Sequence, residues 1–328
     1  MRIPFLWSCA LVLAAVGGNV RAAAAADFQP AVVYDMGGKF DRSFNQSAYD
    51  GAERFKKETG LAYREFEITN AAQREQAIAQ LARRGATVIV AVGFTQASAV
   101  EKVAKDFPNV KFTLIDAVVD LPNVQSVVFR EQESSFLCGL AAALASKSGK
   151  VGFVGGMDIP LIRKFALGYR EGVKYGNATA DIFENMTGTT PAAWSDPSKG
   201  AELAKSQIGR GADVIFHAAG ATGTGVMQAA KDAGKLSIGC DSNQNYLQPG
   251  SVLTSAVKRV DVAVFNAFTT ARAGTWKAGQ LSLGLKEDGV DFALDQYNRT
   301  ILTPAIEARL KQAKADIISG RIKVSEYK

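Results

Sequence analysis

The sequence predicts an α/β protein of two lobes, each built on a doubly wound parallel sheet and joined to the other by a multi-strand hinge. Short apolar strands alternate with amphipathic helices along nearly the whole chain, which is the pattern of parallel sheets covered on both faces. Strands such as Val88–Val92 are continuous apolar runs, as strands buried on both faces require. The alternation forms two series of similar length, and 328 residues exceed the usual size of a single hydrophobic core.

The first series predicts most of one lobe. Its strands are apolar and rich in β-branched residues, and its helices repeat apolar residues at intervals of three and four. The predicted strands are Ala31–Asp35, Tyr63–Ile68, Thr87–Val92, Lys111–Asp116 and Ser126–Phe129, and the predicted helices are Ser47–Glu58, Ala71–Arg84 and Thr95–Phe107.

The second series predicts the other lobe by the same pattern. Its predicted strands are Val151–Gly155, Asp181–Asn185, Val214–Ala218, Ser237–Cys240 and Val252–Ala256, and its predicted helices are Phe136–Ser146, Leu161–Tyr175, Pro197–Arg210 and Thr224–Ala233.

The chain is expected to cross between the lobes three times, near Val128–Glu131, Ala256–Arg259 and Phe292–Tyr297. A helix at Val262–Ala273 and a strand at Gln280–Leu285 would complete the first lobe. The final helix, about Ala305–Ser319, buries one apolar face. The first lobe is therefore predicted to comprise residues 27–128 plus 258–292, and the second residues 129–257 plus 293–328.

The N-terminus, residues 1–26, has the features of a secretory signal peptide. Arg2 precedes the apolar run Ile3–Val16, and alanines that fit a cleavage site follow it, so we expect cleavage after Ala26 or shortly before it. The apolar run is too short for a membrane span of roughly 20 residues. Cys9 lies inside this run rather than after it, which disfavours a lipid anchor. The mature protein is thus expected to be soluble and periplasmic.

Charge and cysteine content narrow the class of partner. The formal net charge of +6 is mild, and its basic residues are scattered without interleaved aromatics, so nucleic acid is not an expected partner. Export leaves Cys138 and Cys240, which an oxidising compartment would allow to pair. Each lies in an apolar run, which favours two separate buried thiols.

Residues at the carboxyl ends of the predicted strands are the candidate ligand contacts, because ligands of open α/β sheets bind there. They combine aromatic rings, carboxylates, an amide and a lysine, a set that suits a flat polar ring carrying a diol. The ligand-binding candidates are Asp35, Phe44, Asn45, Phe94 and Asp116 in the first lobe, and Trp194, His217, Gly220, Asp241 and Lys258 in the second lobe and the return segment.

Each candidate also has a structural interpretation. The carboxylates can cap a helix or turn, the aromatic rings can belong to the core, and Lys258 can be a solvated surface residue. His217 is the only histidine and lies in an apolar strand, so a buried core role is the favoured interpretation. At the start of the first helix, backbone N–H groups are expected to be free for a ligand, with Ser43 as the alternative N-cap.

A glycine-rich turn, Phe216–Gly225, follows a predicted strand, and Asp241 ends the next strand. This imitates a dinucleotide-binding motif, but its spacing is GxxGxG rather than GxGxxG. We therefore expect close approach of a ligand to the backbone and no cofactor. The sequence has no metal-ligand spacing around its histidine and no G-x-S-x-G motif. An enzyme is not expected, although paired carboxylates leave a hydrolase open.

Six segments in chain order resemble the Bmp, or PnrA-like, family of solute receptors for ABC importers. They are Asp41–Ala48, Phe136–Gly139, Val151–Met157, Trp194–Gly200, Ala219–Gly223 and Ile238–Gln244. The resemblance implies a type I periplasmic-binding-protein fold, a nucleoside, often a purine nucleoside, enclosed between the lobes, and delivery to an ABC permease and its ATPase by a monomeric receptor. Some members of the family are similar to receptors for adenine or riboflavin, and many are lipoproteins.

The resemblance also implies roles for individual residues. Phe44 would stack on the base, with Trp194 as the aromatic of the second lobe. Asn45 and Asp116 would bond the edge of the base. The ribose would be held by Asp241, Gly220 and Lys258.

Two departures from the family concern the glycine-rich turn: Ala221 replaces a common glycine, and His217 lies beside the turn. The alternatives left open are a sugar or autoinducer receptor on the same fold, an exported nucleoside hydrolase or oxidoreductase, and a partner of a membrane sensor.

Overall fold

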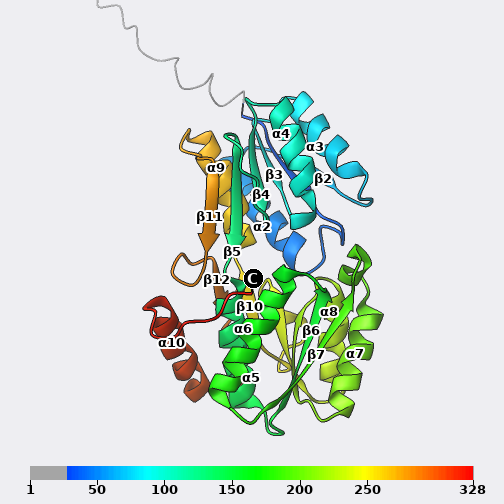
Figure 1. The fold of residues 1–328 in the computed structure, drawn as a ribbon, viewed down its shortest axis with the longest axis vertical. Coiled ribbons are helices and arrows are strands. Elements are labelled where there is room, and N and C mark those ends of the chain that lie inside the picture. The colour runs from blue at the N-terminus through cyan, green and yellow to red at the C-terminus, as the bar shows by residue number, and fades with distance from the viewer. Residues whose placement is uncertain (1–27, 328) are drawn as a thin grey trace, which may run out of the picture.

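The computed structural model describes residues 28–327. The predicted signal peptide, residues 1–26, lies outside the described residues. Two lobes of similar construction lie one above the other in Figure 1, each with a central sheet between layers of helices. The predicted fold class is confirmed.

The first lobe contains β1 (Pro30–Tyr34), α2 (Phe44–Thr59), β2 (Arg64–Glu67), α3 (Gln73–Arg83), β3 (Val88–Ala91), η1 (Phe94–Gln96), α4 (Ala97–Asp106), β4 (Lys111–Ile115), β5 (Val124–Phe129), α9 (Val260–Arg272) and β11 (Gly279–Leu283). Its strands are ordered β11-β5-β4-β3-β1-β2, and every neighbouring pair is parallel. Helices α2 and α9 pack on one face of this sheet, and α3 and α4 pack on the other.

The second lobe contains α5 (Glu131–Ala145), β6 (Lys150–Met157), α6 (Pro160–Gly176), β7 (Asp181–Gly188), η2 (Pro191–Trp194), α7 (Pro197–Gly209), β8 (Val214–Ala218), α8 (Thr222–Asp232), β9 (Leu236–Asp241), η3 (Asn245–Leu247), β10 (Val252–Lys258), β12 (Val290–Phe292) and α10 (Pro304–Ile318). Its strands are ordered β12-β10-β9-β8-β6-β7. All neighbouring pairs are parallel except β10 and β12, which are antiparallel.

Within residues 28–327, the chain crosses between the two sheets after β5, after β10 and between β11 and β12. The first two crossings lie where the sequence predicts them. The third was predicted near Phe292–Tyr297, but β12 (Val290–Phe292) already pairs with β10 in the second sheet. The prediction was too late in the chain, because three residues of an antiparallel edge strand leave almost no periodic pattern.

Glycines bring α5 and α6 into close contact beside the hinge. A Cβ added at Gly172 would lie 1.9 Å from the Phe136 carbonyl oxygen, and one added at Gly139 would lie 2.1 Å from the Tyr169 carbonyl oxygen. Because such distances exclude any side chain, these positions require glycine. The pair forms a rigid support for Glu131, the first residue of α5, which lies at the site described below.

Candidate functional site

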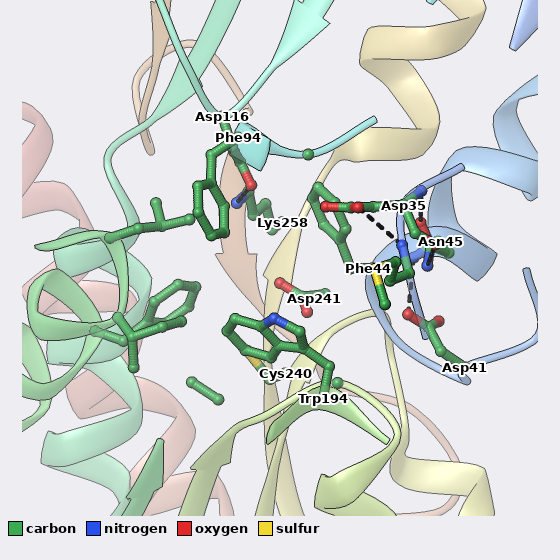
Figure 2. A pocket seen from close by; sticks show the side chains of 17 residues that line it. Asp35, Asp41, Phe44, Asn45, Phe94, Asp116, Trp194, Cys240, Asp241 and Lys258 are labelled. Atoms are coloured by element: carbon green, nitrogen blue, oxygen red, sulfur yellow. Dashed lines mark hydrogen bonds and ion pairs between the residues drawn. The ribbon is translucent and has the colours of Figure 1, made fainter. Parts of the chain in front are cut away.

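A cavity between the lobes, about 590 Å³ in volume and partly open to solvent, is lined by residues of both lobes. Its walls come largely from the carboxyl ends of the strands, as expected for open α/β sheets, and Figure 2 shows the residues that line it. Nine of the ten predicted residues line it: Asp35, Phe44, Asn45, Phe94, Asp116, Trp194, Gly220, Asp241 and Lys258.

Asp41 organises the segment that presents Phe44 to this cavity. Its carboxylate accepts hydrogen bonds from the backbone N–H groups of Ser43, Asn45 and Gln46, at 2.8, 3.0 and 3.1 Å. The expectation that N–H groups at the start of α2 are free for a ligand is therefore wrong, because the buried carboxylate of Asp41 accepts from three of them. Burial raises the pKa of Asp41 to about 6, against the opposing effect of these bonds.

Ser43 bridges the lobes instead of capping α2. Its side chain makes no capping bond, and its hydroxyl lies 2.7 Å from Asp241 Oδ2 and 3.1 Å from the Cys240 carbonyl oxygen. Two further hydrogen bonds join the same segments: the Ser242 hydroxyl donates to the Ser43 carbonyl, and Gln244 Nε2 donates to the Arg42 carbonyl. Phe44 is thus fixed relative to the strand end that carries Asp241.

The amide of Asn45 is already bonded to the backbone. Its Oδ1 accepts from the Asp35 N–H at 3.1 Å, and its Nδ2 lies 3.1 Å from the Asp35 carbonyl and 3.2 Å from the Gly38 carbonyl. The structure places Asn45 at the cavity wall, but it gives the amide a different task from the base contact that the resemblance implies.

Two carboxylates at the strand ends have a left-handed backbone conformation. Asp116, which follows β4, has φ +70°, and Asp241, which ends β9, has φ +65°. The nearby Arg42 has φ +61°. This conformation costs most non-glycine residues roughly 1–2 kcal/mol, but Asp and Asn adopt it at lower cost because their short polar side chains bond locally. Asp is therefore suited to both of these strand ends, where it lines the cavity.

A buried charge cluster occupies the hinge side of the cavity. Lys258 Nζ lies 2.6 Å from Asp116 Oδ2 and 3.1 Å from Glu131 Oε1, and all three side chains are at most 3% exposed. Lys164 Nζ lies 3.0 Å from Glu131 Oε2. With Asp241, the cluster sets three carboxylates against two ammonium groups, so it carries an excess of negative charge when all are ionised.

Two acceptors of the cluster, Asp116 Oδ1 and Glu131 Oε1, are buried and receive no hydrogen bond from residues 28–327, and of the two only Glu131 Oε1 has an ion pair, with Lys258. Burial raises the pKa of Asp116 to about 6, although Lys258 opposes this change. For Lys258, burial lowers the pKa, but Asp116, Glu131 and Asp241 outweigh it and leave the pKa above its ordinary value. Burial likewise raises the pKa of Asp241. The protein therefore buries acceptors that a ligand with donor groups would satisfy.

Aromatic rings from both lobes face the remaining space in Figure 2, with Phe44 and Phe94 from the first lobe and Trp194 from the second. The indole of Trp194 lies against Gly156, where an added Cβ would come within 2.0 Å of the ring. Gly220 has φ +56°, a conformation favoured by glycine, and lines the same wall. The arrangement offers flat apolar faces for a planar ring.

His217 does not line the cavity and is fully buried in the second lobe. Its imidazole lies against Gly223, where an added Cβ would be 2.0 Å from Nδ1, and burial lowers its pKa to about 4. The interpretation of His217 as a core residue fits this position. The prediction that His217 contacts the ligand does not fit this position. Side chains alternate between the two faces of a strand, and it is Ala218, the next and last residue of β8, that lines the cavity.

Several residues at the site were not predicted. In the sequence, Glu131 resembles an ordinary acidic residue in the first turn of a helix. The only indication that it lies near the cavity was its position in the predicted crossing between the lobes. Leu161, Ile162 and Phe165 line the wall from the first turns of α6. Their position just after a strand end was available from the sequence.

Within residues 28–327, no group of three or more His, Cys, Asp or Glu side chains could hold a metal ion, and no helix is long and apolar enough to cross a membrane. Cys138 and Cys240 are separate, buried thiols, as the sequence favours.

Comparisons with known proteins agree with this architecture. The model of the family described as Bmp, ABC transporter substrate-binding protein PnrA-like, matches residues 28–328. The ABC transporter nucleoside-binding protein BmpA of Lactococcus lactis is 33% identical over 321 residues, which cover 91% of this chain and 89% of that protein. An uncharacterized lipoprotein of Pyrococcus abyssi is 36% identical over 295 residues, which cover 84% and 71%.

The crystal structure of a solute-binding protein of an ABC transporter system from Aeropyrum pernix K1 has a TM-score of 0.83 and 30% identity, and the match covers 91% of this chain and 93% of that one. The chain therefore belongs to the Bmp family of PnrA-like ABC transporter substrate-binding proteins.

Proposed function

We propose that this protein is a non-catalytic receptor that encloses a nucleoside, preferably a purine nucleoside, between its lobes and delivers it to an ABC permease. One observation carries the proposal: the cavity combines aromatic faces from both lobes with buried carboxylates, of which Asp116 keeps an oxygen, Oδ1, that receives no hydrogen bond from the described residues. A planar base suits the rings, and ribose hydroxyls suit the carboxylates. A similar protein, BmpA of Lactococcus lactis, is named as nucleoside-binding.

The charge of the cavity supports an uncharged ligand. Asp116, Glu131 and Asp241 outnumber the ammonium groups of Lys164 and Lys258. A phosphate group would add negative charge beside carboxylates in a site of low dielectric, where like charges repel strongly. Nucleosides should therefore bind, and nucleotides should be rejected.

The proposed roles follow the position of each group. Asp241 accepts from the ribose hydroxyls, and Lys258 donates to a ribose oxygen. Phe44 and Trp194 hold the base between the lobes. Gly220 lets the ligand approach the backbone closely, because it carries no side chain.

We further propose that the protein is exported, monomeric and without a lipid anchor, and that its partners are a membrane permease and ATPase. The lobes proposed from the strand assignments comprise residues 28–129 plus 259–283, and residues 130–258 plus 290–327. Cleavage would remove the predicted signal peptide, residues 1–26, from the mature protein. Mass spectrometry of the isolated protein would identify its N-terminal residue and any attached lipid.

Calorimetric titration tests the ligand proposal. The titrants are adenosine, guanosine, inosine, uridine, adenine, riboflavin and ribose, with adenosine monophosphate as the charged control. We expect saturable binding of at least one purine nucleoside at one site per chain and no binding of the monophosphate. Flat heats for every nucleoside would refute the proposal. Release of hypoxanthine from inosine would refute its non-catalytic part.

A further inference from the structure

Glu131 is a buried charge that lies behind the cavity wall without lining it. It is the first residue of α5 and is fully buried. Its Oε1 lies 3.1 Å from Lys258 Nζ, and its Oε2 lies 3.0 Å from Lys164 Nζ. Lys164 belongs to α6 and does not line the cavity either. One carboxylate therefore joins an ammonium group on the cavity wall to an ammonium group outside it.

Close packing fixes the backbone of Glu131 against α6. An added Cβ at Gly168 would lie 2.2 Å from the carbonyl oxygen of Gln132, the residue that follows Glu131. Lys164 precedes Gly168 by four residues, so both lie on the face of α6 that meets α5. Lys164 Nζ also donates to the carbonyl of Phe129, the last residue of β5, at 3.3 Å. The Glu131 carboxylate is thus held by the second lobe and by the crossing that leads into it.

Lys258 has a carboxylate partner in each lobe. Its Nζ donates to Asp116 Oδ2 in the first lobe at 2.6 Å, and it forms the ion pair with Glu131 in the second lobe. The elements that carry Glu131 and Lys258, α5 and β10, pack together, so this pair does not depend on how far the lobes close. Asp116 alone would draw the ammonium group towards the first lobe, and Glu131 opposes that movement.

Three aromatic rings further restrict the position of the ammonium group. Lys258 Nζ lies 5.1 Å from the ring centroids of Phe44 and Phe129 and 6.0 Å from that of Phe165. An ammonium group has three N–H donors, and within residues 28–327 only Asp116 accepts a hydrogen bond from it. Donors therefore remain for a ligand in the cavity that Lys258 lines.

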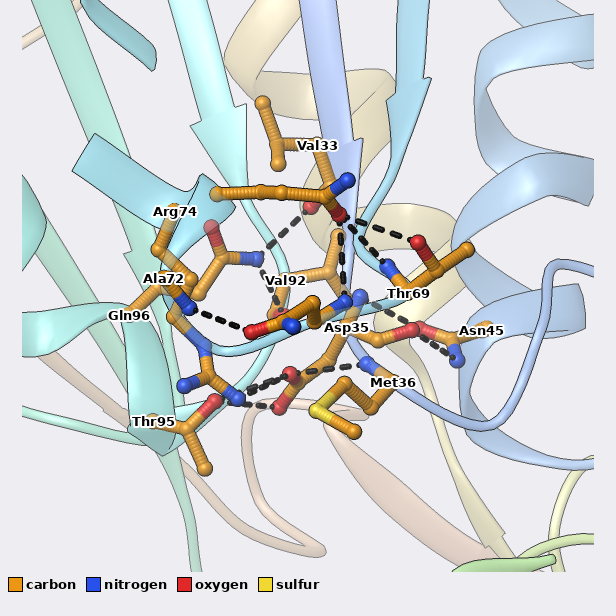
Figure 3. A network of polar contacts seen from close by, with 12 residues as sticks. Val33, Asp35, Met36, Asn45, Thr69, Ala72, Arg74, Val92, Thr95 and Gln96 are labelled. Atoms are coloured by element: carbon orange, nitrogen blue, oxygen red, sulfur yellow. Dashed lines mark hydrogen bonds and ion pairs between the residues drawn. The ribbon is translucent and has the colours of Figure 1, made fainter. Parts of the chain in front are cut away.

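The first lobe supports a charged residue of the wall in the same way (Figure 3). Arg74 Nη2 lies 3.3 Å from Asp35 Oδ1, and the Thr95 hydroxyl lies 2.7 Å from Asp35 Oδ2. Asp35 lines the cavity, whereas Arg74 and Thr95 do not. In both lobes, residues outside the cavity hold a charged group on its wall, which is how binding sites keep their polar groups in a fixed geometry.

We infer that Glu131 and Lys164 are positioning residues: Glu131 holds the Lys258 ammonium group at the ribose end of the cavity, and Lys164 holds Glu131 in the place from which it does so. The inference rests on the proposed nucleoside function, in which Lys258 donates to a ribose oxygen. It adds that this contact depends on two residues outside the cavity.

Adenosine analogues that lack one ribose oxygen test the inference on the full chain. Calorimetry with adenosine and with 2′-deoxy-, 3′-deoxy- and 5′-deoxyadenosine gives three affinity ratios, and the matching guanosine series is used if guanosine binds more tightly. In the wild type, loss of the oxygen that accepts from Lys258 should weaken binding about tenfold or more, because a charged donor loses its acceptor. Glu131→Gln, which removes the charge but keeps the shape, should shrink that ratio severalfold. Lys164→Met should shrink it in the same sense.

Lys258→Met identifies the relevant oxygen, since only the ratio that depends on Lys258 should fall towards one in this variant. Adding Glu131→Gln to Lys258→Met should then change that ratio no further, because both substitutions act through the same ammonium group. Thermal unfolding of each variant checks that it folds. The Lys164 side chain is 18% exposed, so Lys164→Met supplies the test if Glu131→Gln does not fold.

Two matched controls lie on the same helices. Glu133→Gln removes the charge of an α5 residue that pairs with Arg130 and accepts from the Leu285 N–H. Lys174→Met removes an α6 ammonium group that donates to two backbone carbonyls. Neither residue lines the cavity or pairs with Lys258. Both controls should leave the three ratios unchanged, whatever they do to the melting temperature.

The outcomes separate this inference from the proposed function. If nucleosides bind but no ratio responds to Glu131→Gln or Lys164→Met, the positioning role is wrong and the receptor function stands. An equal loss of affinity for all four ligands in these variants would show a purely structural role and also overturn the inference. So would three ratios that are independent of Lys258. Failure of the wild type to bind any nucleoside would overturn both.

Discussion

Asp241→Asn is the substitution that tests the proposed ribose contact most directly. Asp241 ends β9 with φ +65°, and its Oδ2 accepts from the Ser43 hydroxyl at 2.7 Å. Asparagine also tolerates this left-handed conformation and keeps an oxygen for Ser43. Alanine would add backbone strain of about 1–2 kcal/mol, so a loss of affinity in Asp241→Ala would mix two causes.

The magnitude follows from the bonds that the charge makes. A hydrogen bond to a charged group contributes about 1.5–3 kcal/mol, which corresponds to a loss of about 10- to 150-fold in affinity. Stability should respond in the opposite direction. Burial raises the pKa of Asp241, which means that the folded protein disfavours the charge, and a neutral amide relieves that cost. We therefore expect weaker ligand binding without a lower melting temperature.

Calorimetry with adenosine, 2′-deoxyadenosine and 3′-deoxyadenosine measures the effect and locates it. The loss of a hydroxyl that Asp241 binds should weaken wild-type binding and have less effect on the variant. The control is Asp288→Asn, because Asp288 also has a left-handed backbone, with φ +52°, but is exposed and lies outside the cavity. Wild-type affinity in Asp241→Asn, with normal discrimination between the three ligands, would refute the assigned role.

Three further predictions address the base, pH and packing. Phe44→Ala should weaken nucleoside binding about tenfold or more by removing a stacking face, whereas Phe40→Ala should not, since Phe40 is 61% exposed and outside the cavity; similar affinities in calorimetry would exclude stacking. Affinity should fall as pH drops through about 6, where Asp116 becomes protonated and loses acceptor capacity, and titrations from pH 5 to 8 should show it; a flat profile would contradict it. Gly223→Ala should lower the free energy of unfolding by about 1–3 kcal/mol through overpacking against the buried imidazole, unlike Gly209→Ala, which meets nothing within 4 Å; equal melting curves would disprove the clash.

The sequence placed most of the site because the site depends on strand ends. Asp116 and Asp241 each follow or end an apolar run, and the carboxyl ends of parallel strands meet at one edge. The same rule failed for His217, since a strand directs neighbouring side chains to opposite faces and the sequence alone does not fix which residue is last. Ala218, one position later, lines the cavity instead.

Ser43 and Asn45 show a different limit. A serine before a helix is a common N-cap, and only the approach of β9 from the other lobe diverts its hydroxyl to Asp241. The amide of Asn45 has several possible partners, and the turn at Gly38 decides which carbonyl it meets. Such choices depend on contacts between segments far apart in the chain, which local patterns do not encode.

We propose that closure of the lobes is coupled to the ligand by buried groups that the empty cavity leaves unsatisfied. Asp116 Oδ1 receives no hydrogen bond from the described residues, and an unsatisfied buried acceptor costs about 1–3 kcal/mol. Opening the lobes would return such groups to water, so the empty closed form bears a cost that a donor-bearing ligand removes. A ligand shifts a conformational equilibrium only by its differential affinity for the two states. The Ser43–Asp241 hydrogen bond joins the lobes with or without a ligand. The donors of the ligand would supply the rest of the free energy that favours the closed form.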